Sequence, residues 1–150
     1  MIEKKSRVLS GVSGEYFVAA ELSRLGYIAS ITLRNTKGID ILVSNEDASK
    51  SVGLQIKTNQ GLRKAWLLGE KCENYFSDNL FYVFVNLKAQ KSRPDYHVVP
   101  SKVVSEYTKK DYSEWINTPG RKGQKHNETP MRMFRDKEDK YLERWNLLGL

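Results

Sequence analysis

Cysteine and long apolar runs are scarce in this chain of 150 residues. Cys72 is the only cysteine, which excludes an internal disulfide and a cysteine-rich zinc site and suits a reducing compartment. The polar stretch from Met1 to Arg7 is not followed by the apolar core of a signal peptide. No apolar run approaches the roughly 20 residues that a membrane span needs. We therefore expect a cytoplasmic protein with no membrane partner.

The sequence also lacks internal repeats, low-complexity tracts and any linker that would divide it. Its length is sufficient for one domain with its own core. Hydrophobic residues make up 39% and charged residues 29% of the chain, a balance that argues against disorder. We expect a single domain over residues 1–150.

Positive charge exceeds negative charge over the chain as a whole. The formal net charge is +7 and the isoelectric point is about 9.4. This balance favours an anionic partner, with nucleic acid first and an acidic membrane surface second. A soluble basic protein without such a partner is the plainer alternative.

Two short apolar runs between Gly38 and Thr58 carry polar side chains within them. Asp40 lies in the first run, and Gln55 and Lys57 lie in the second. Because alternate residues of a strand share a face, Gln55 and Lys57 project together. The polar segment 44–51 suits a hairpin that pairs the two strands and brings Asp40 close. An acid, an amide oxygen and an amine then meet, unless Asp40 serves only in a salt bridge with Lys57.

The first helix is predicted to begin at Gly14, with Ser13 as its cap, after a basic lead-in over residues 1–12. Gly26 ends it. The spacing predicts a buried stripe of Val18, Leu22 and Leu25. Glu15 falls on the same inward face, at the helix N-terminus, where the helix dipole alone would favour an acid.

The remaining apolar runs predict an α/β domain: a helix, an antiparallel three-stranded meander, a crossover helix and further strands in one mixed sheet. The strand around Asp40 has apolar residues on both faces, which is typical of a central strand. Residues 34–38 form a polar turn before it. Other strands are expected over 27–33, 80–87 and 96–99. Other helices are expected over 69–77, from a cap at Ser101, and over 136–148.

Residues 117–135 are predicted to form a basic irregular loop. Prolines and glycines interrupt regular structure there, and five cations face the single acid Glu128. A basic run is often only a solvated surface, and its functional interpretation is contact with phosphates. Two further cations, Arg63 and Lys64, follow the strand that carries Lys57. The predicted nucleic-acid-binding residues are therefore Arg63, Lys64, Arg121, Lys122, Lys125, His126 and Arg132.

The chemistry of Glu15, Asp40 and Gln55 points to a hard metal ion. Carboxylate and amide oxygens suit Mg²⁺ or Mn²⁺ better than zinc. Such an ion can polarise a phosphodiester and activate water. Lys57 beside it can orient or deprotonate that water and offset the charge that grows on the phosphate.

At these residues the chain resembles the PD-(D/E)XK nuclease superfamily, with its restriction-endonuclease-like fold, and most closely the Holliday-junction-resolvase and Mrr-like branches. The family pattern is a helix glutamate, a strand aspartate and a (Glu/Gln)-x-Lys strand. Here these are Glu15, Asp40 in Gly-Ile-Asp-Ile-Leu-Val, and Gln55-Ile56-Lys57.

The resemblance implies roles for these residues. Asp40, Gln55, the Ile56 carbonyl and Glu15 would bind the metal, and Lys57 would serve the attacking water. Gln55 replaces the commoner glutamate, which removes a negative charge from the metal shell. Glu21 is a rival for the helix acid, but it points to a different face.

The resulting hypothesis is a Mg²⁺- or Mn²⁺-dependent endonuclease that hydrolyses DNA phosphodiester bonds. The substrate can be duplex or branched, and a homodimer is open because two cuts need two sites. The alternatives are a catalytically inactive nucleic-acid-binding module of the same fold, or a structural partner in a DNA repair or defence complex.

Overall fold

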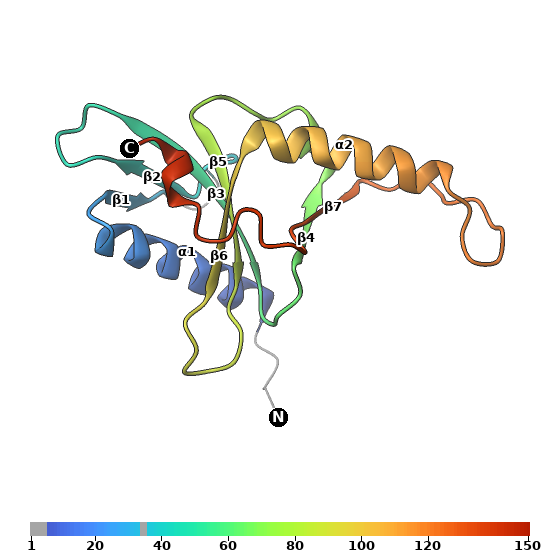
Figure 1. Ribbon diagram of the computed structural model, residues 1–150, viewed down its shortest axis with the longest axis horizontal. Helices are drawn as coiled ribbons and strands as arrows, with labels where there is room; N and C mark the ends of the chain where they lie inside the picture. Colours follow the sequence, from blue (N-terminus) through green and yellow to red (C-terminus); the bar gives the residue numbers. More distant parts are fainter. Residues whose placement is uncertain (1–5, 34–35) are drawn as a thin grey trace.

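A five-stranded mixed sheet forms the centre of the computed structural model, which describes residues 6–33 and 36–150 (Figure 1). Its strand order is β1-β2-β3-β5-β6, and a two-stranded ribbon pairs β4 with β7. The helices are α1 (Arg7–Arg24) and α2 (Ser101–Asn117), with short 3₁₀ helices η1 (Glu70–Glu73) and η2 (Trp145–Leu148). The strands are β1 (Ile28–Ile31), β2 (Ile41–Ser44), β3 (Ser51–Asn59), β4 (Ala65–Gly69), β5 (Leu80–Asn86), β6 (Asp95–Pro100) and β7 (Met131–Arg135).

The predicted fold class is confirmed by the pairing of the strands. β1, β2 and β3 form an antiparallel meander, β3 and β5 are parallel, and β5 and β6 are antiparallel. A parallel pair requires a crossover connection. Here the crossover consists of β4 and the 3₁₀ helix η1, in place of the longer helix expected over residues 69–77.

Helix α1 begins earlier than predicted. The Ser6 hydroxyl caps it by accepting a hydrogen bond from the Leu9 N–H at 3.1 Å, so the prediction of Ser13 as the cap was wrong. Both serines suit a cap, and Gly11 between them is tolerated within the helix. Glu15 therefore lies in the middle of α1, and the helix dipole does not explain it. Leu25 is 43% exposed, because α1 ends one residue before it.

Parts of two predictions lie outside the described residues. They are positions 1–5 of the basic lead-in and positions 34–35 of the polar turn. Of the rest of the lead-in, residues 7–12 belong to α1.

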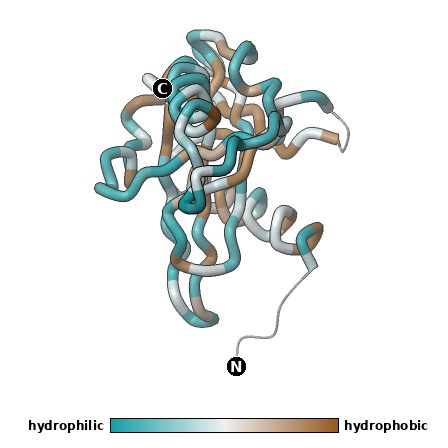
Figure 2. Tube along the Cα trace, turned by 90° about the vertical axis from the view of Figure 1, so that its right-hand side faces the viewer, coloured by the Kyte–Doolittle hydropathy of each residue, from teal (hydrophilic) through white to brown (hydrophobic). Residues whose placement is uncertain are grey.

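The two faces of the main sheet carry different cores. On the α1 face, Val18 and Leu22 pack against Ile41, Leu54 and Ile56. On the other face, an aromatic cluster lies under α2 and the β4–β7 ribbon; it contains Trp66, Tyr82, Phe84 and Phe134. Figure 2 shows the hydrophobic stretches concentrated in the middle of the molecule.

Strand β2 is less covered than predicted. Ile41 and Val43 are buried on the α1 face, but Leu42, on the opposite face, is 49% exposed. The predicted interior position is confirmed, since β2 lies between β1 and β3, but its second face is open because the elements that cover that face lie over β5 and β6.

The C-terminal third differs most from the prediction. Residues 131–135 form strand β7 and not part of an irregular loop, and no α-helix forms over residues 136–148. Asp139 and Glu143 have φ near +57° and +55°, which no α-helix tolerates. The segment instead pairs with β6 through the Val98 and Glu143 N–H groups.

Helix α2 begins at the predicted residue, but for a different reason. The Ser101 hydroxyl forms no cap; it donates to the Ser77 carbonyl at 3.0 Å and accepts from the Ser77 N–H at 3.1 Å. These bonds attach the start of α2 to the end of the crossover. No helix among the described residues is both long and apolar enough to cross a membrane.

Candidate active site

Strand β3 carries the (Glu/Gln)-x-Lys residues on the face opposite α1. Leu54 and Ile56 are buried toward α1, while Gln55 and Lys57 alternate with them and are half-buried. The parallel neighbour β5 places Tyr82 beside Gln55. The sequence prediction that Gln55 and Lys57 share a face is thereby confirmed.

Gln55 and Lys57 line an open cleft of about 790 Å³ on this face. The crossover supplies one wall of the cleft, and Lys37 with Gly38 supplies another part of its edge. Of the residues that the structure describes, three lysines line the cleft, Lys37, Lys57 and Lys71, against the single acid Glu70. The lining is therefore suited to an anionic ligand.

Gly38 lets the crossover approach the edge of this cleft. Its φ is +72°, a conformation that costs a side-chain-bearing residue free energy, and a Cβ at this position would overlap the Tyr75 ring. Tyr75 therefore covers the backbone two residues before Asp40. The glycine fixes both the turn and the contact.

Asp40 is held against β3 immediately before β2 begins. Its N–H donates to the Leu54 carbonyl at 2.8 Å, and its carboxylate Oδ2 accepts from the Ile56 N–H at 2.7 Å. The Asp40 carboxylate therefore lies against the backbone of Ile56, the residue between Gln55 and Lys57. Within the described part of the chain, Asp40 forms no ion pair with Lys57, so the plain salt-bridge interpretation is not supported.

Glu15 approaches from a different direction. It is half-buried on α1, which covers the opposite face of the sheet, and it does not line the cleft. Its neighbour Gly14 lies directly against the Thr58 side chain, since a Cβ there would overlap the Thr58 hydroxyl. This close contact places Glu15 near the end of β3 that follows Lys57.

Glu21, the rival helix acid, has a structural role. Its carboxylate accepts from Arg24 at 2.8 Å and from Arg93 at 2.7 Å, and the residue is 7% exposed. The hydrogen bond from Arg24 holds the pKa of Glu21 below its usual value, with Arg93 adding to the effect against the opposing influence of burial.

The oxygen donors near the cleft suit a hard divalent ion. Asp40 offers a carboxylate and Gln55 an amide oxygen, which match the preference of Mg²⁺ for oxygen ligands. Among the described residues there is no group of three or more His, Cys, Asp or Glu side chains placed to hold a metal. A site here would depend on the amide and on backbone oxygen.

Two neutral groups complete the cleft wall. Burial raises the pKa of the Cys72 thiol and, more strongly, that of the Tyr82 phenol. Both therefore remain protonated at neutral pH. The cleft gains no negative charge from either of them.

The predicted nucleic-acid-binding residues fall into three groups. Arg63 and the three cations of the segment after α2 are exposed. Lys64 pairs with Asp139, and the half-buried His126 stacks on a tryptophan ring of α2. Arg132 is 8% exposed, pairs with Glu73 and lies over the Tyr112 ring at 3.5 Å. Its prediction as a phosphate contact is contradicted by this burial, because β7 turns its side chain inward.

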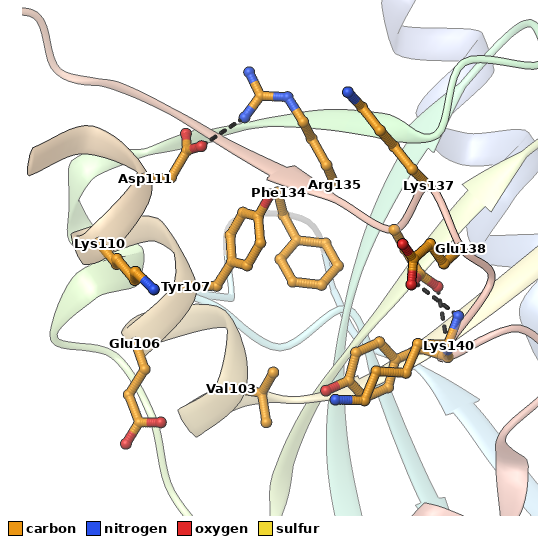
Figure 3. A pocket seen from close by; sticks show the side chains of 12 residues that line it. Val103, Glu106, Tyr107, Lys110, Asp111, Phe134, Arg135, Lys137, Glu138 and Lys140 are labelled. Carbon is orange, nitrogen blue, oxygen red and sulfur yellow. Dashed lines mark hydrogen bonds and ion pairs between the residues drawn. The ribbon is translucent and has the colours of Figure 1, made fainter. Parts of the chain in front are cut away.

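A larger cavity of about 930 Å³ lies between α2 and the segment after β7 (Figure 3). Its floor contains Tyr107 and Phe134, and its rim carries charges of both signs. Arg135 donates to Asp111 at 2.8 Å across part of this rim. Paired charges make this cavity less suited to a phosphate than the lysine-lined cleft.

Lys37, Lys71 and Tyr75 also line the cleft, but they lie outside the sequence motifs that predicted the site. Lys71 and Tyr75 belong to the crossover, which carries no motif, and their position depends on the parallel pairing of β3 with β5. Lys37 could have been found, since it precedes Gly38 at the edge of the Asp40 turn.

No protein-family model and no curated protein matches the sequence. Among solved structures, a bacterial homing endonuclease, I-Ssp6803I, superposes with a TM-score of 0.59 and 12% identity over 97% of this chain and 94% of that chain. Hjc, a Holliday junction resolvase of the archaeal hyperthermophile Archaeoglobus fulgidus, superposes with a TM-score of 0.50 and 12% identity over 93% and 95%. The chain thus shares the mixed α/β fold of these two nucleases, with a five-stranded sheet and two helices.

Proposed function

We propose that this protein is a metal-dependent endonuclease that hydrolyses DNA phosphodiester bonds at the cleft beside β3. One observation carries the proposal: the Asp40 carboxylate is anchored on the Ile56 N–H, between Gln55 and Lys57, the two β3 residues that line the lysine-rich cleft. The structural neighbours, a homing endonuclease and a Holliday junction resolvase, support the same class of reaction.

Mg²⁺ or Mn²⁺ would be held by Asp40, the Gln55 amide oxygen and the Ile56 carbonyl; Glu15, which lies on the α1 side of the sheet and does not line the cleft, is left out of this set. When bound, the ion supplies Lewis-acid polarisation of the phosphate and a more acidic water. The hydrogen bond from Ile56 fixes the direction of the Asp40 carboxylate and leaves its second oxygen for a ligand.

The lysines provide the remaining chemistry. Lys57 orients the attacking water and stabilises the negative charge that develops on the phosphate oxygens. Lys37 and Lys71, which line the same cleft, bind the phosphates that flank the scissile bond. Lys57 is available for this role because, among the residues that the structure describes, it pairs with no carboxylate.

The test is cleavage of plasmid, linear duplex and branched DNA by the purified protein with Mg²⁺ or Mn²⁺. Asp40→Asn and Lys57→Met should each lower the rate by about 10²–10⁴-fold without lowering the melting temperature by more than a few degrees. Asp78→Asn and Lys102→Met, at exposed positions away from the cleft, are the matched controls. Equal cleavage by the Asp40 and Lys57 variants would remove these residues from the site.

A nucleic-acid-binding module without turnover is the second candidate. It is favoured by the lack of a group of three acidic, histidine or cysteine ligands among the described residues, together with the neutral Gln55. Under this alternative the protein binds DNA with a steep salt dependence but cuts none of the substrates. Gln55→Glu then distinguishes the two: an added carboxylate should strengthen Mn²⁺ binding at a genuine metal site.

A further inference from the structure

A basic segment extends away from the body of the protein beyond the end of α2 (Figure 1). We call residues 118–130, between α2 and β7, the arm. Its cations Arg121, Lys122 and Lys125 are all exposed, and its only acid is Glu128. The arm therefore presents a cluster of positive charge at a distance from the cleft.

Hydrogen bonds and ring stacking order the arm. The Gly120 N–H donates to the Gln124 carbonyl at 2.9 Å, and the Lys122 N–H donates to the Gln124 side-chain oxygen at 2.9 Å. The His126 ring stacks on the Trp115 indole of α2 at 4.1 Å between centroids. These contacts hold the arm in place before any ligand binds.

The same chain of contacts continues to the cleft. Trp115 lies 5.9 Å from the Tyr112 ring, and the Arg132 guanidinium covers Tyr112 at 3.5 Å. Arg132 pairs with Glu73, which follows the cleft residue Cys72. At its other end the arm finishes at Pro130, which lines the cleft. The arm is thus fixed relative to the cleft from both sides.

The length of α2 sets the distance between the arm and the cleft. The Cys72 thiol at the cleft wall contacts the Thr108 hydroxyl at 3.4 Å, and the helix then continues to Asn117. That part of the helix spans about 14 Å at about 1.5 Å per residue. With the start of the arm added, Arg121 and Lys122 lie up to about 20 Å from the Cys72 wall of the cleft, or about six base-pair steps of about 3.4 Å, and Lys125, five residues before the cleft residue Pro130, lies within about 17 Å of Pro130.

We propose that the arm is a rigid clamp for duplex DNA that contacts the phosphate backbone about six base pairs to one side of the bond in the cleft. Two charge clusters at a fixed separation match a stiff polymer, and duplex DNA stays straight over far longer distances. A flexible single strand gains less from a fixed spacing. The inference rests on the proposed function and specifies its substrate as duplex that extends beyond the cleavage site.

The test compares binding with cleavage prevented, in EDTA or Ca²⁺, to hairpin-closed duplexes of about 8 and about 24 base pairs and to a single strand of the longer length. Arg121→Ala/Lys122→Ala/Lys125→Ala should weaken binding of the long duplex by about 10–100-fold and reduce the slope of log K against log[salt] by about two to three. The loss on the short duplex should be several-fold smaller.

Two further variants sharpen the test. Lys50→Ala/Lys91→Ala/Arg144→Ala removes the same charge from exposed positions on other elements and should leave the preference for long duplex unchanged. Trp115→Ala keeps every cation and His126 but removes the ring on which His126 stacks, and should weaken long-duplex binding by several-fold with the salt slope nearly intact.

Equal losses on short duplex, long duplex and single strand would overturn the clamp, as would an arm variant that binds the long duplex like the parent protein. Cleavage reports on the other proposal. Length-dependent binding through the arm without any metal-stimulated cleavage would reject the endonuclease and keep the clamp. Metal-stimulated cleavage by a protein whose DNA binding does not depend on the arm would keep the endonuclease and reject the clamp.

Discussion

The two faces of the main sheet are built from the same strands but differ in how completely they are covered. On the α1 face, Leu54 and Ile41 are fully buried in an aliphatic core closed by the helix. On the opposite face, α2 and the β4–β7 ribbon cover β5 and β6 with stacked aromatic rings, and Gln55 and Lys57 are left beside an open cleft.

This difference separates stability from the candidate chemistry within a single strand. Every second residue of β3 contributes to the closed core, and the residues between them face the cleft. Polar groups can therefore be placed on β3 without opening the core. The aromatic cluster supports the cleft from one side only, because the ribbon ends at Gly69 and Met131.

The largest expected effect on stability comes from replacing one of two adjacent residues of β3. Leu54→Ala should lower the free energy of unfolding by about 2–5 kcal/mol, because it leaves a cavity beneath α1. Gln55→Ala, one residue away, should change it by less than about 1 kcal/mol while lowering DNA cleavage. Urea denaturation and a plasmid assay on both variants measure the contrast. Equal destabilisation by the two changes would mean that the cleft face is also a core.

The second effect tests the ion pair beneath the aromatic face. Arg132→Ala leaves the Glu73 carboxylate, whose side chain is 19% exposed, without its cation and should lower the free energy of unfolding by about 2–3 kcal/mol. The double variant Arg132→Met/Glu73→Leu removes both charges and should recover most of this loss. Double-mutant analysis by urea denaturation measures the coupling. No coupling would mean that Arg132 acts through its ring contact alone.

The third effect concerns the edge of the cleft. Gly38→Ala adds a Cβ that overlaps Tyr75 at a φ of +72°, which should lower the free energy of unfolding by about 1–2 kcal/mol. Tyr75→Ala in the same chain should relieve the overlap but not the backbone strain, so recovery should be partial. Thermal denaturation of the single and double variants measures both. Full recovery would assign the whole effect to the ring contact.

Strands β2 and β3 could be predicted from the sequence because the alternation of side chains between the two faces of a strand is a local pattern. Alternation placed Gln55 and Lys57 together, and the polar hairpin predicted the antiparallel pairing of β2 with β3. The position of Glu15 relative to the sheet was not predictable, since it depends on which face α1 covers. The roles of Glu15, Asp40, Gln55 and Lys57 in catalysis stay predictions.

The aromatic face was harder to predict because tertiary contacts outweigh its local signals. Strand β7 has the sequence Met-Arg-Met-Phe-Arg, and its buried residues are Arg132 and Phe134. Because one of the two buried residues is an arginine, the sequence lacks the alternation of apolar and polar residues that predicts a strand. In the C-terminal segment, Trp145 and Leu148 fit helical spacing and are buried in the short 3₁₀ helix η2, but the residues before them form no α-helix and pair with β6. Periodicity alone does not distinguish these outcomes.

The smallest expected effect on stability comes from Glu21, at the rim of the α1 face, and it depends on pH. The Arg24 hydrogen bond, with Arg93, lowers the pKa of Glu21 from its usual 4.5. The ionised carboxylate therefore stabilises the folded state above about pH 4.5, and this contribution is lost as the pH falls through the lower pKa of the folded protein. Glu21→Gln should reduce stability at pH 6 by about 1 kcal/mol or less and reduce the difference between pH 6 and pH 3. Urea denaturation at both pH values measures this change, with Glu46→Gln in the exposed hairpin as the control. An unchanged acid dependence in Glu21→Gln would show that the carboxylate contributes only by filling space.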